Sequence, residues 1–151
     1  MNKLRALSRD LADRFMVPSE QFDSWAEQVT LTLIWKPAEQ GLHMGDMRYR
    51  AVIVIARFAD SPGRLMALLA SWLEVNDPGR EDHTLSAPVF EIDQITPDVA
   101  DIELQLDFIE PLHLAESEDG EINAFGKHWA FVPFDLWVAE QGSVNHDRPN
   151  A

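Results

Sequence analysis

The chain has 151 residues, 46% of them hydrophobic, no cysteine, and a formal net charge of -14. This length and apolar content predict one domain with a real core over residues 1–140, followed by a flexible polar tail over residues 141–151. The lack of cysteine excludes disulfides, thiolate zinc sites and cysteine nucleophiles. Since the chain has neither a signal-peptide pattern nor a long apolar run, we expect a soluble cytosolic protein without a membrane partner.

The negative charge is concentrated in the second half of the chain. Residues 1–80 contain ten acidic and ten basic residues, whereas residues 81–151 contain sixteen acidic residues and only Lys127 and Arg148 as basic ones. Such a surface repels phosphates, so specific nucleic-acid recognition is not expected. Two interpretations stay open: a solvated face that keeps the protein soluble, or a negative surface that faces a basic partner or a channel.

The first eighty residues predict two helices and two strands. Leucines at helical spacing predict an amphipathic helix over residues 2–16, and period-two alternation predicts a strand over residues 28–36, ended by Pro37. Residues 38–47 are polar and contain two glycines, so we expect a loop. Residues 51–58 are nearly all apolar and β-branched, which predicts a strand buried on both faces.

An explicit junction follows that strand. Ser61 is placed to cap a helix whose first residue is Pro62, and apolar residues then recur at helical spacing. Asn76, Asp77 and Pro78 end this helix.

The second half predicts strands with an acidic face. A short strand is expected near residues 89–92, and residues 101–108 alternate between apolar and mostly acidic side chains. Pro111 is expected to bulge or interrupt the second of these strands. Asp119 and Gly120 predict a tight turn, with a hairpin that returns through Ile122 and Phe125.

This element order predicts an α+β domain, with a mostly antiparallel sheet and two helices packed on one face. No catalytic signature accompanies it. The five histidines lack the spacing of a metal site, and the acidic cluster near Glu118 lacks the ligand pattern of a calcium loop, so no metal or cofactor is expected. The aromatic group near the C-terminus is typical of either a core or a subunit contact, and it comprises Trp129, Phe131, Phe134 and Trp137.

Two stretches of the chain resemble the tail completion protein R family of contractile-tailed temperate phages and R-type pyocins. They are RYRAVIVIARF with the helix LMALLASWLEVNDP, and VFEIDQITPDVADIELQLDFIEPLHLAESEDGEI. The resemblance implies a non-enzymatic structural protein that caps the head-proximal end of the tail, stops polymerisation of the tube and sheath, and docks the head. It also implies a homo-hexameric ring, assembly in the host cytoplasm, and tube, sheath and head-tail connector proteins as partners. DNA is expected to pass through the lumen of this ring.

In such a ring, three sets of residues are candidates for contacts. The lumen or partner face would comprise Asp101, Glu103, Asp107, Glu118, Asp119 and Glu121. The loop before the central strand would contact the tail tube through Glu39, Gln40, His43 and Asp46. The subunit interface would use Trp129, Phe131, Phe134 and Trp137.

A small acidic inhibitor or immunity-type protein that masks a basic partner is the alternative from another functional class. An enzyme with an unrecognised carboxylate pair such as Asp98 and Asp101 is a third hypothesis.

Overall fold

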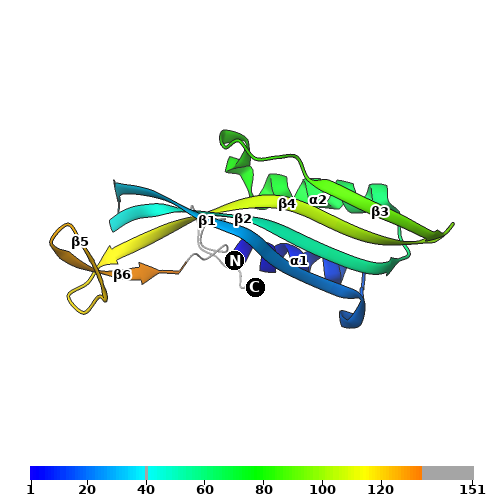
Figure 1. Cartoon of the computed structure of the whole chain (residues 1–151), viewed down its shortest axis with the longest axis horizontal. Helices are drawn as coiled ribbons and strands as arrows, with labels where there is room; N and C mark the ends of the chain where they lie inside the picture. The colour runs from blue at the N-terminus through cyan, green and yellow to red at the C-terminus, as the bar shows by residue number, and fades with distance from the viewer. Residues whose placement is uncertain (40, 134–151) are drawn as a thin grey trace. The chain divides into compact units, whose positions relative to one another are not determined.

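A computed structural model describes residues 1–39 and 41–133 of the chain (Figure 1). Over these residues it contains two α-helices, two short 3₁₀ turns and six strands. The helices are α1 (Asn2–Arg14) and α2 (Pro62–Asn76), and the 3₁₀ turns are Ser19–Gln21 and Pro78–Asp82. The strands are β1 (Phe22–Ala38), β2 (Gly41–Phe58), β3 (Val89–Thr96), β4 (Val99–Glu116), β5 (Ile122–Ala124) and β6 (Lys127–Val132). None of the described helices is long and apolar enough to cross a membrane.

The six strands form one sheet, with the order β1-β2-β4-β6-β5 and with β3 also paired to β4. The β3–β4, β4–β6 and β5–β6 pairs are all antiparallel. The prediction of an α+β fold with a mostly antiparallel sheet is therefore confirmed.

The chain divides into two compact units, which are described separately. We call residues 1, 3–28 and 49–108 the helical unit, and residues 2, 29–48 and 109 onward the strand unit. Strands β1, β2 and β4 are long enough to run through both units.

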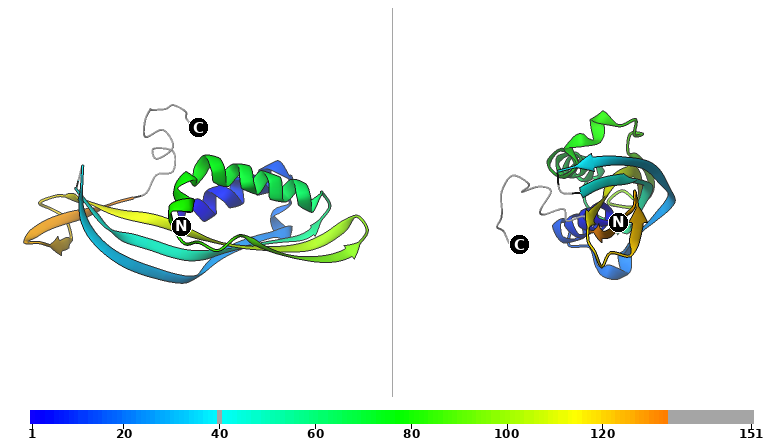
Figure 2. Two further views of the ribbon diagram at one scale, coloured as in Figure 1. Left: turned by 90° about the horizontal axis from the view of Figure 1, so that it is seen from above. Right: turned by 90° about the vertical axis from the view of Figure 1, so that its left-hand side faces the viewer.

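The core of the helical unit joins its helices to its strands. The hydroxyl of Tyr49 accepts a hydrogen bond from the Leu4 backbone N–H at 3.2 Å, and its ring lies 5.9 Å from that of Phe108. Phe108 in turn meets Trp72 of α2 edge-on at 6.1 Å. Figure 2 shows α1 and α2 beside each other. The large side chains that are almost fully buried in this unit include Leu7, Leu11, Ile53, Ile55, Leu65, Ile102 and Leu104.

The junction predicted between strand and helix is confirmed. Ser61 accepts a hydrogen bond from the Arg64 backbone N–H at 3.2 Å, and Pro62 is the first residue of α2. In the strand before it, Ala51, Val52 and Ile53 are each at most 1% exposed. Since consecutive strand residues point to opposite faces, this part of β2 is buried on both of them, as expected.

The loop predicted over residues 38–47 is wrong. β1 continues through Pro37 to Ala38 and β2 begins at Gly41, and Glu39, the described residue between them, lies in a turn. The glycines that indicated a loop are instead points of close approach between strands. A Cβ on Gly45 would lie 2.4 Å from the Thr32 carbonyl oxygen, and one on Gly41 would overlap that of Leu114.

The second half also differs from expectation at two points. Pro111 does not interrupt β4. It lies between the segment of β4 that pairs with β3 and the segment that pairs with β6, so its missing N–H removes no hydrogen bond from either pairing. The hairpin predicted after Gly120 is displaced along the chain. β6, rather than the segment at Ile122, returns beside β4, because Phe125 and Gly126 both have positive φ and make a second tight turn.

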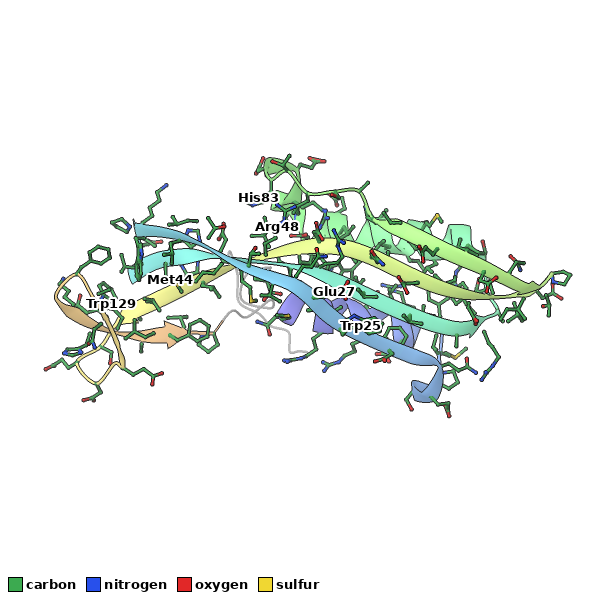
Figure 3. All side chains as sticks on the ribbon, viewed as in Figure 1. Trp25, Glu27, Met44, Arg48, His83 and Trp129 are labelled. Atoms are coloured by element: carbon green, nitrogen blue, oxygen red, sulfur yellow. The ribbon has the colours of Figure 1, made fainter. Side chains whose placement is uncertain are left out.

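The strand unit has a small core of its own. Leu42, Leu114 and Trp129 are buried together, and four half-buried side chains pack around them: Trp35, Met44, Ile122 and Ala124. The indole N–H of Trp129 donates to the Ala124 carbonyl oxygen at 2.8 Å. Figure 3 labels Met44 and Trp129 in this part of the chain.

Candidate assembly surfaces

Four carboxylates form a ladder across two strands of the helical unit. In the register between β3 and β4, Glu91 lies directly opposite Glu103, and Asp93 lies directly opposite Asp101. Directly opposed residues of an antiparallel pair project from the same face. We call these four residues the carboxylate ladder.

Strand alternation points the carboxylate ladder away from the core. Ile102 and Leu104 are almost fully buried, and Phe108, two pleats further, contacts α2 through Trp72. Asp101 and Glu103 occupy the intervening positions, so they project from the opposite face of β4. β4 therefore has an acidic face at Asp101 and Glu103, as predicted, and β3 adds Glu91 and Asp93 to the same face.

Asp107 does not share the exposure expected for that face. It is buried, and its Oδ1 lies 3.4 Å from Nε of Arg50, so its charge is directed at a neighbouring strand of the same chain. The sequence does not reveal the burial of Asp107. Strand alternation predicts that only one of two consecutive residues is buried, whereas Asp107 and Phe108 are both buried.

The carboxylate ladder has an electrostatic cost in the isolated chain. Like charges that face each other across a strand pair destabilise it, by roughly 0.2–1 kcal/mol for each pair. Two local hydrogen bonds offset part of this cost. Oδ1 of Asp101 accepts one from the Arg57 backbone N–H at 2.8 Å, and Oε2 of Glu103 accepts one from the Gln105 side-chain amide at 2.6 Å. A cationic partner on this face would remove the remaining repulsion.

β1 adds an aromatic and an acidic side chain to the exposed surface of the helical unit. The Ser24 hydroxyl faces Ser8 of α1 at 3.1 Å, so alternation directs Trp25 away from that helix. Trp25 is 40% exposed and donates its indole N–H to Glu27 at 3.2 Å (Figure 3). Exposed tryptophan beside carboxylates is a composition typical of protein-binding surfaces.

The acidic turn of the strand unit is present as predicted. Glu118, Asp119 and Glu121 are all exposed, and the turn closes through a hydrogen bond from the Gly120 N–H to the Ser117 carbonyl oxygen at 3.0 Å. Gly120 is required there because a Cβ would lie 2.2 Å from the Trp129 carbonyl oxygen.

His43 and Asp46, expected in a loop, lie on β2 and contact each other. The distance from His43 Nε2 to Asp46 Oδ1 is 2.8 Å, and the His43 ring stacks on His113 of β4 with centroids 4.9 Å apart. The pKa of His113 is lowered, first by its partial burial and second by repulsion from His43. A hydrogen bond with the Leu42 backbone and the charge of Asp46 act in the opposite direction and raise this pKa, but by less. Of the described residues expected to contact a tail tube, only Glu39 lies in a turn, and Gln40 lies outside the described residues.

The aromatic group divides between core and surface. Trp129 is 6% exposed and belongs to the core of the strand unit, whereas Phe131, two residues further along β6, is 48% exposed. Phe134 and Trp137 lie outside the described residues, as does the tail over residues 141–151. Of the two described members of this group, Phe131 is therefore the one whose side chain is exposed and available for a contact.

Sequence reasoning missed part of these surfaces. Glu91 and Asp93 alternate with Phe90 and Ile92, which signals a strand with an acidic face, but their pairing opposite Glu103 depends on register. Over residues 1–39 and 41–133, no group of three or more His, Asp or Glu side chains could hold a metal ion.

Comparison with known proteins adds a family to this geometry. The family model described as P2 phage tail completion protein R (GpR) matches residues 1–133. The chain is also 28% identical over 137 residues to a protein of Haemophilus phage HP1 named "Uncharacterized 19.2 kDa protein in rep-hol intergenic region". That alignment covers 85% of this chain and 82% of the phage protein. No solved structure gives a significant match.

Proposed function

Since this chain belongs to the P2 phage tail completion protein R family, we propose that it is a structural component of a contractile phage tail or pyocin-like particle. It caps the head-proximal end of the tail, stops polymerisation of tube and sheath, and completes the surface that joins the head through connector proteins. It assembles in the host cytoplasm, remains in the tail, and performs no catalysis.

The carboxylate ladder is the observation that carries this proposal beyond family membership. In a homo-hexameric ring with both helices packed on one face of each sheet, the opposite face is free for the lumen or for a neighbour. A lumen wall bearing the ladder repels the phosphates of passing DNA and prevents adhesion. A ring structure with the ladder on its outer rim would contradict this assignment.

The turn between β1 and β2 is the remaining candidate for contact with the tail tube. Deleting residues 40–45 would remove part of β2, so it cannot separate folding from function. Glu39→Lys tests the turn without shortening β2, because Glu39 is exposed in the turn. Normal tail lengths with this variant would indicate that the turn does not contact the tail tube.

Electron microscopy of tails tests the proposed function. Particles assembled without this chain should be overlong or lack a cap, and expression of the intact chain should restore uniform length. A variant with Asp93, Asp101 and Glu103 changed to Asn, Asn and Gln should still cap the tails but retain DNA at low salt, where charge effects are least screened. Uniform, capped tails in the absence of the chain would refute the proposal.

An acidic inhibitor of a basic partner is the second candidate, and the same carboxylate ladder favours it. Oligomeric state distinguishes the two functions. A ring of six 17.1 kDa subunits would have a mass of about 100 kDa by light scattering, whereas the inhibitor would remain a monomer or dimer. Formation of rings only on added tails would also support the cap.

A further inference from the structure

The strand unit exposes more large apolar side chains than it buries. Its core cluster contains three buried residues, Leu42, Leu114 and Trp129. Against these stand seven exposed ones among the described residues of this unit: Val29, Leu31, Leu33, Ile34, Phe125, Phe131 and Val132. They do not form one surface, because consecutive strand residues such as Leu33 and Ile34 point to opposite faces.

Four of these side chains follow an edge strand. Val29, Leu31 and Leu33 are 49%, 55% and 58% exposed, and Ile34 is exposed on the other side of the strand. β1 is the terminal strand in the sheet order, and no charged residue occurs between Val29 and Trp35. We call Val29, Leu31 and Leu33, which share one face of β1, the β1 strip. Natural edge strands usually carry charges that prevent pairing, and this segment lacks them.

The lack of charge favours a second copy of this chain as the occupant. Each copy has a net charge of -14, which residues 81–151 carry, so its acidic surface repels that of another copy. The neutral β1 strip is a place where two copies can approach without that repulsion.

A different patch of the same unit supplies the matching surface. Phe131 and Val132 of β6 are exposed, and β2 and β4 lie between β6 and β1 in the sheet order. Since these two residues are consecutive in a strand, their side chains point to opposite faces, and we call Phe131 alone the β6 patch. Contact between two different patches is head-to-tail, and a head-to-tail contact can close into a ring, whereas contact between identical patches closes a dimer.

We propose that the β1 strip of one copy packs against the β6 patch of the next, and that this contact joins the subunits of the assembly. The inference rests on the proposed ring. It assigns the interface to β1 and Phe131, and it removes the buried Trp129 from the interface residues expected from sequence.

Disulfide mapping tests the contact directly, because the chain has no cysteine. Full-length Leu33→Cys and full-length Phe131→Cys, one carrying a mass tag, are mixed and mildly oxidised, and the products are separated on a non-reducing gel. The mixed dimer should exceed that of a control pair, Leu33→Cys with Glu74→Cys, by about tenfold, because only the first pair is held in proximity. Glu74 is an exposed position on α2.

Three results would overturn the assignment. Leu33→Cys that forms disulfide dimers with itself as readily as with Phe131→Cys would indicate a symmetric β1 contact. Equal cross-linking of test and control pairs would indicate random collision. Adding Leu31→Glu to the Leu33→Cys chain should abolish the mixed dimer, and retention of the dimer would also count against the proposal. A circular dichroism spectrum like that of the parent chain establishes that this variant folds.

The cross-linking result and the tail-length result are independent. Normal capping without the mixed dimer would overturn this interface alone. A specific mixed dimer from a chain that does not affect tail length would overturn the proposed function and leave the interface in place.

Discussion

Replacing Asp77 with asparagine tests what holds the N-terminal helix to the rest of the helical unit. Asp77 follows the last residue of α2, is 5% exposed, and bridges two cations. Its Oδ1 lies 2.7 Å from Nζ of Lys3 on α1, and its Oδ2 lies 2.7 Å from the Arg80 guanidinium. The substituted amide would keep the size of the side chain while removing the charge that both cations face.

The expected loss of stability is about 3 kcal/mol. Removing one partner of a buried ion pair typically costs about 3–5 kcal/mol, because the opposite charge stays in a poorly solvated site. The Lys3 and Arg80 side chains are 11% and 15% exposed, so both can gain some hydration and the lower end of the range applies. For a chain of this size, 1 kcal/mol corresponds to about 2–4 °C in Tm, which gives a decrease of roughly 6–12 °C.

Thermal and urea unfolding followed by circular dichroism measure this loss. Asp82→Asn is the matched control, because Asp82 is exposed and lies five residues away in the adjacent 3₁₀ turn. It should change the free energy of unfolding by less than about 0.5 kcal/mol. If Asp77→Asn lowered stability no more than Asp82→Asn does, the bridge between Lys3 and Arg80 would not stabilise the unit, and the argument would be wrong.

Three further predictions concern the strands. Gly120→Ala should cost about 1–3 kcal/mol in unfolding free energy, because its Cβ would meet the Trp129 backbone, whereas Gly79→Ala, with nothing within 4 Å, should cost less than about 1 kcal/mol. Since the pKa of His113 is lowered in the folded chain, the unfolded chain binds more protons as pH falls below about 6.5, so stability should decrease there and His113→Gln should reduce that decrease. An NMR titration in which His113 has a midpoint above 6.5 would contradict this prediction. Glu91→Gln should stabilise the chain by roughly 0.2–1 kcal/mol at low salt and by less at high salt, and a destabilised variant would show that the facing Glu103 does not repel it.

The fold is most predictable where local signals agree with one another. From β2 to the end of α2, an apolar β-branched run, a serine cap, a proline at the first helical position and a helical leucine stripe all favour the observed structure. The burial of Val52 on the second face of β2 also follows from sequence, because no polar residue interrupts residues 51–56.

The sequence-based prediction is wrong where a glycine can indicate either a loop or a close approach between two strands. Gly41 and Gly45 indicate a loop when only the sequence is considered, yet both lie in β2 against a neighbouring backbone. A close approach between strands depends on which strands pair, and that information is not local. The turn at Phe125 and Gly126 is equally hard to predict, because phenylalanine rarely adopts the positive φ that this turn requires.

The candidate surfaces show the same limit. The acidic alternation in β4 is visible in the sequence, but the burial of Asp107 and the pairing of Glu91 with Glu103 depend on tertiary packing and register. The alternation over residues 28–36 predicts a strand with one face in water or in a contact, but it does not predict that the face of Val29, Leu31 and Leu33 is exposed. Its apolar side chains distinguish these alternatives in favour of a contact, because water alone does not stabilise Val29, Leu31 and Leu33 on an edge.

Charge and apolar exposure are distributed differently in this chain, and the difference bears on assembly. The helical unit carries facing carboxylates in the carboxylate ladder, whereas the β1 strip of the strand unit is uncharged from Val29 to Trp35. A chain with a charge of -14 that joined copies through its acidic face would bring carboxylates of both copies together, at a cost in electrostatic repulsion. Contacts through the neutral edge avoid this cost and leave the acidic face free to line a lumen or to bind a basic protein. Self-association should therefore depend less on salt than binding of a basic partner does, and the two dependences can be measured on the same chain.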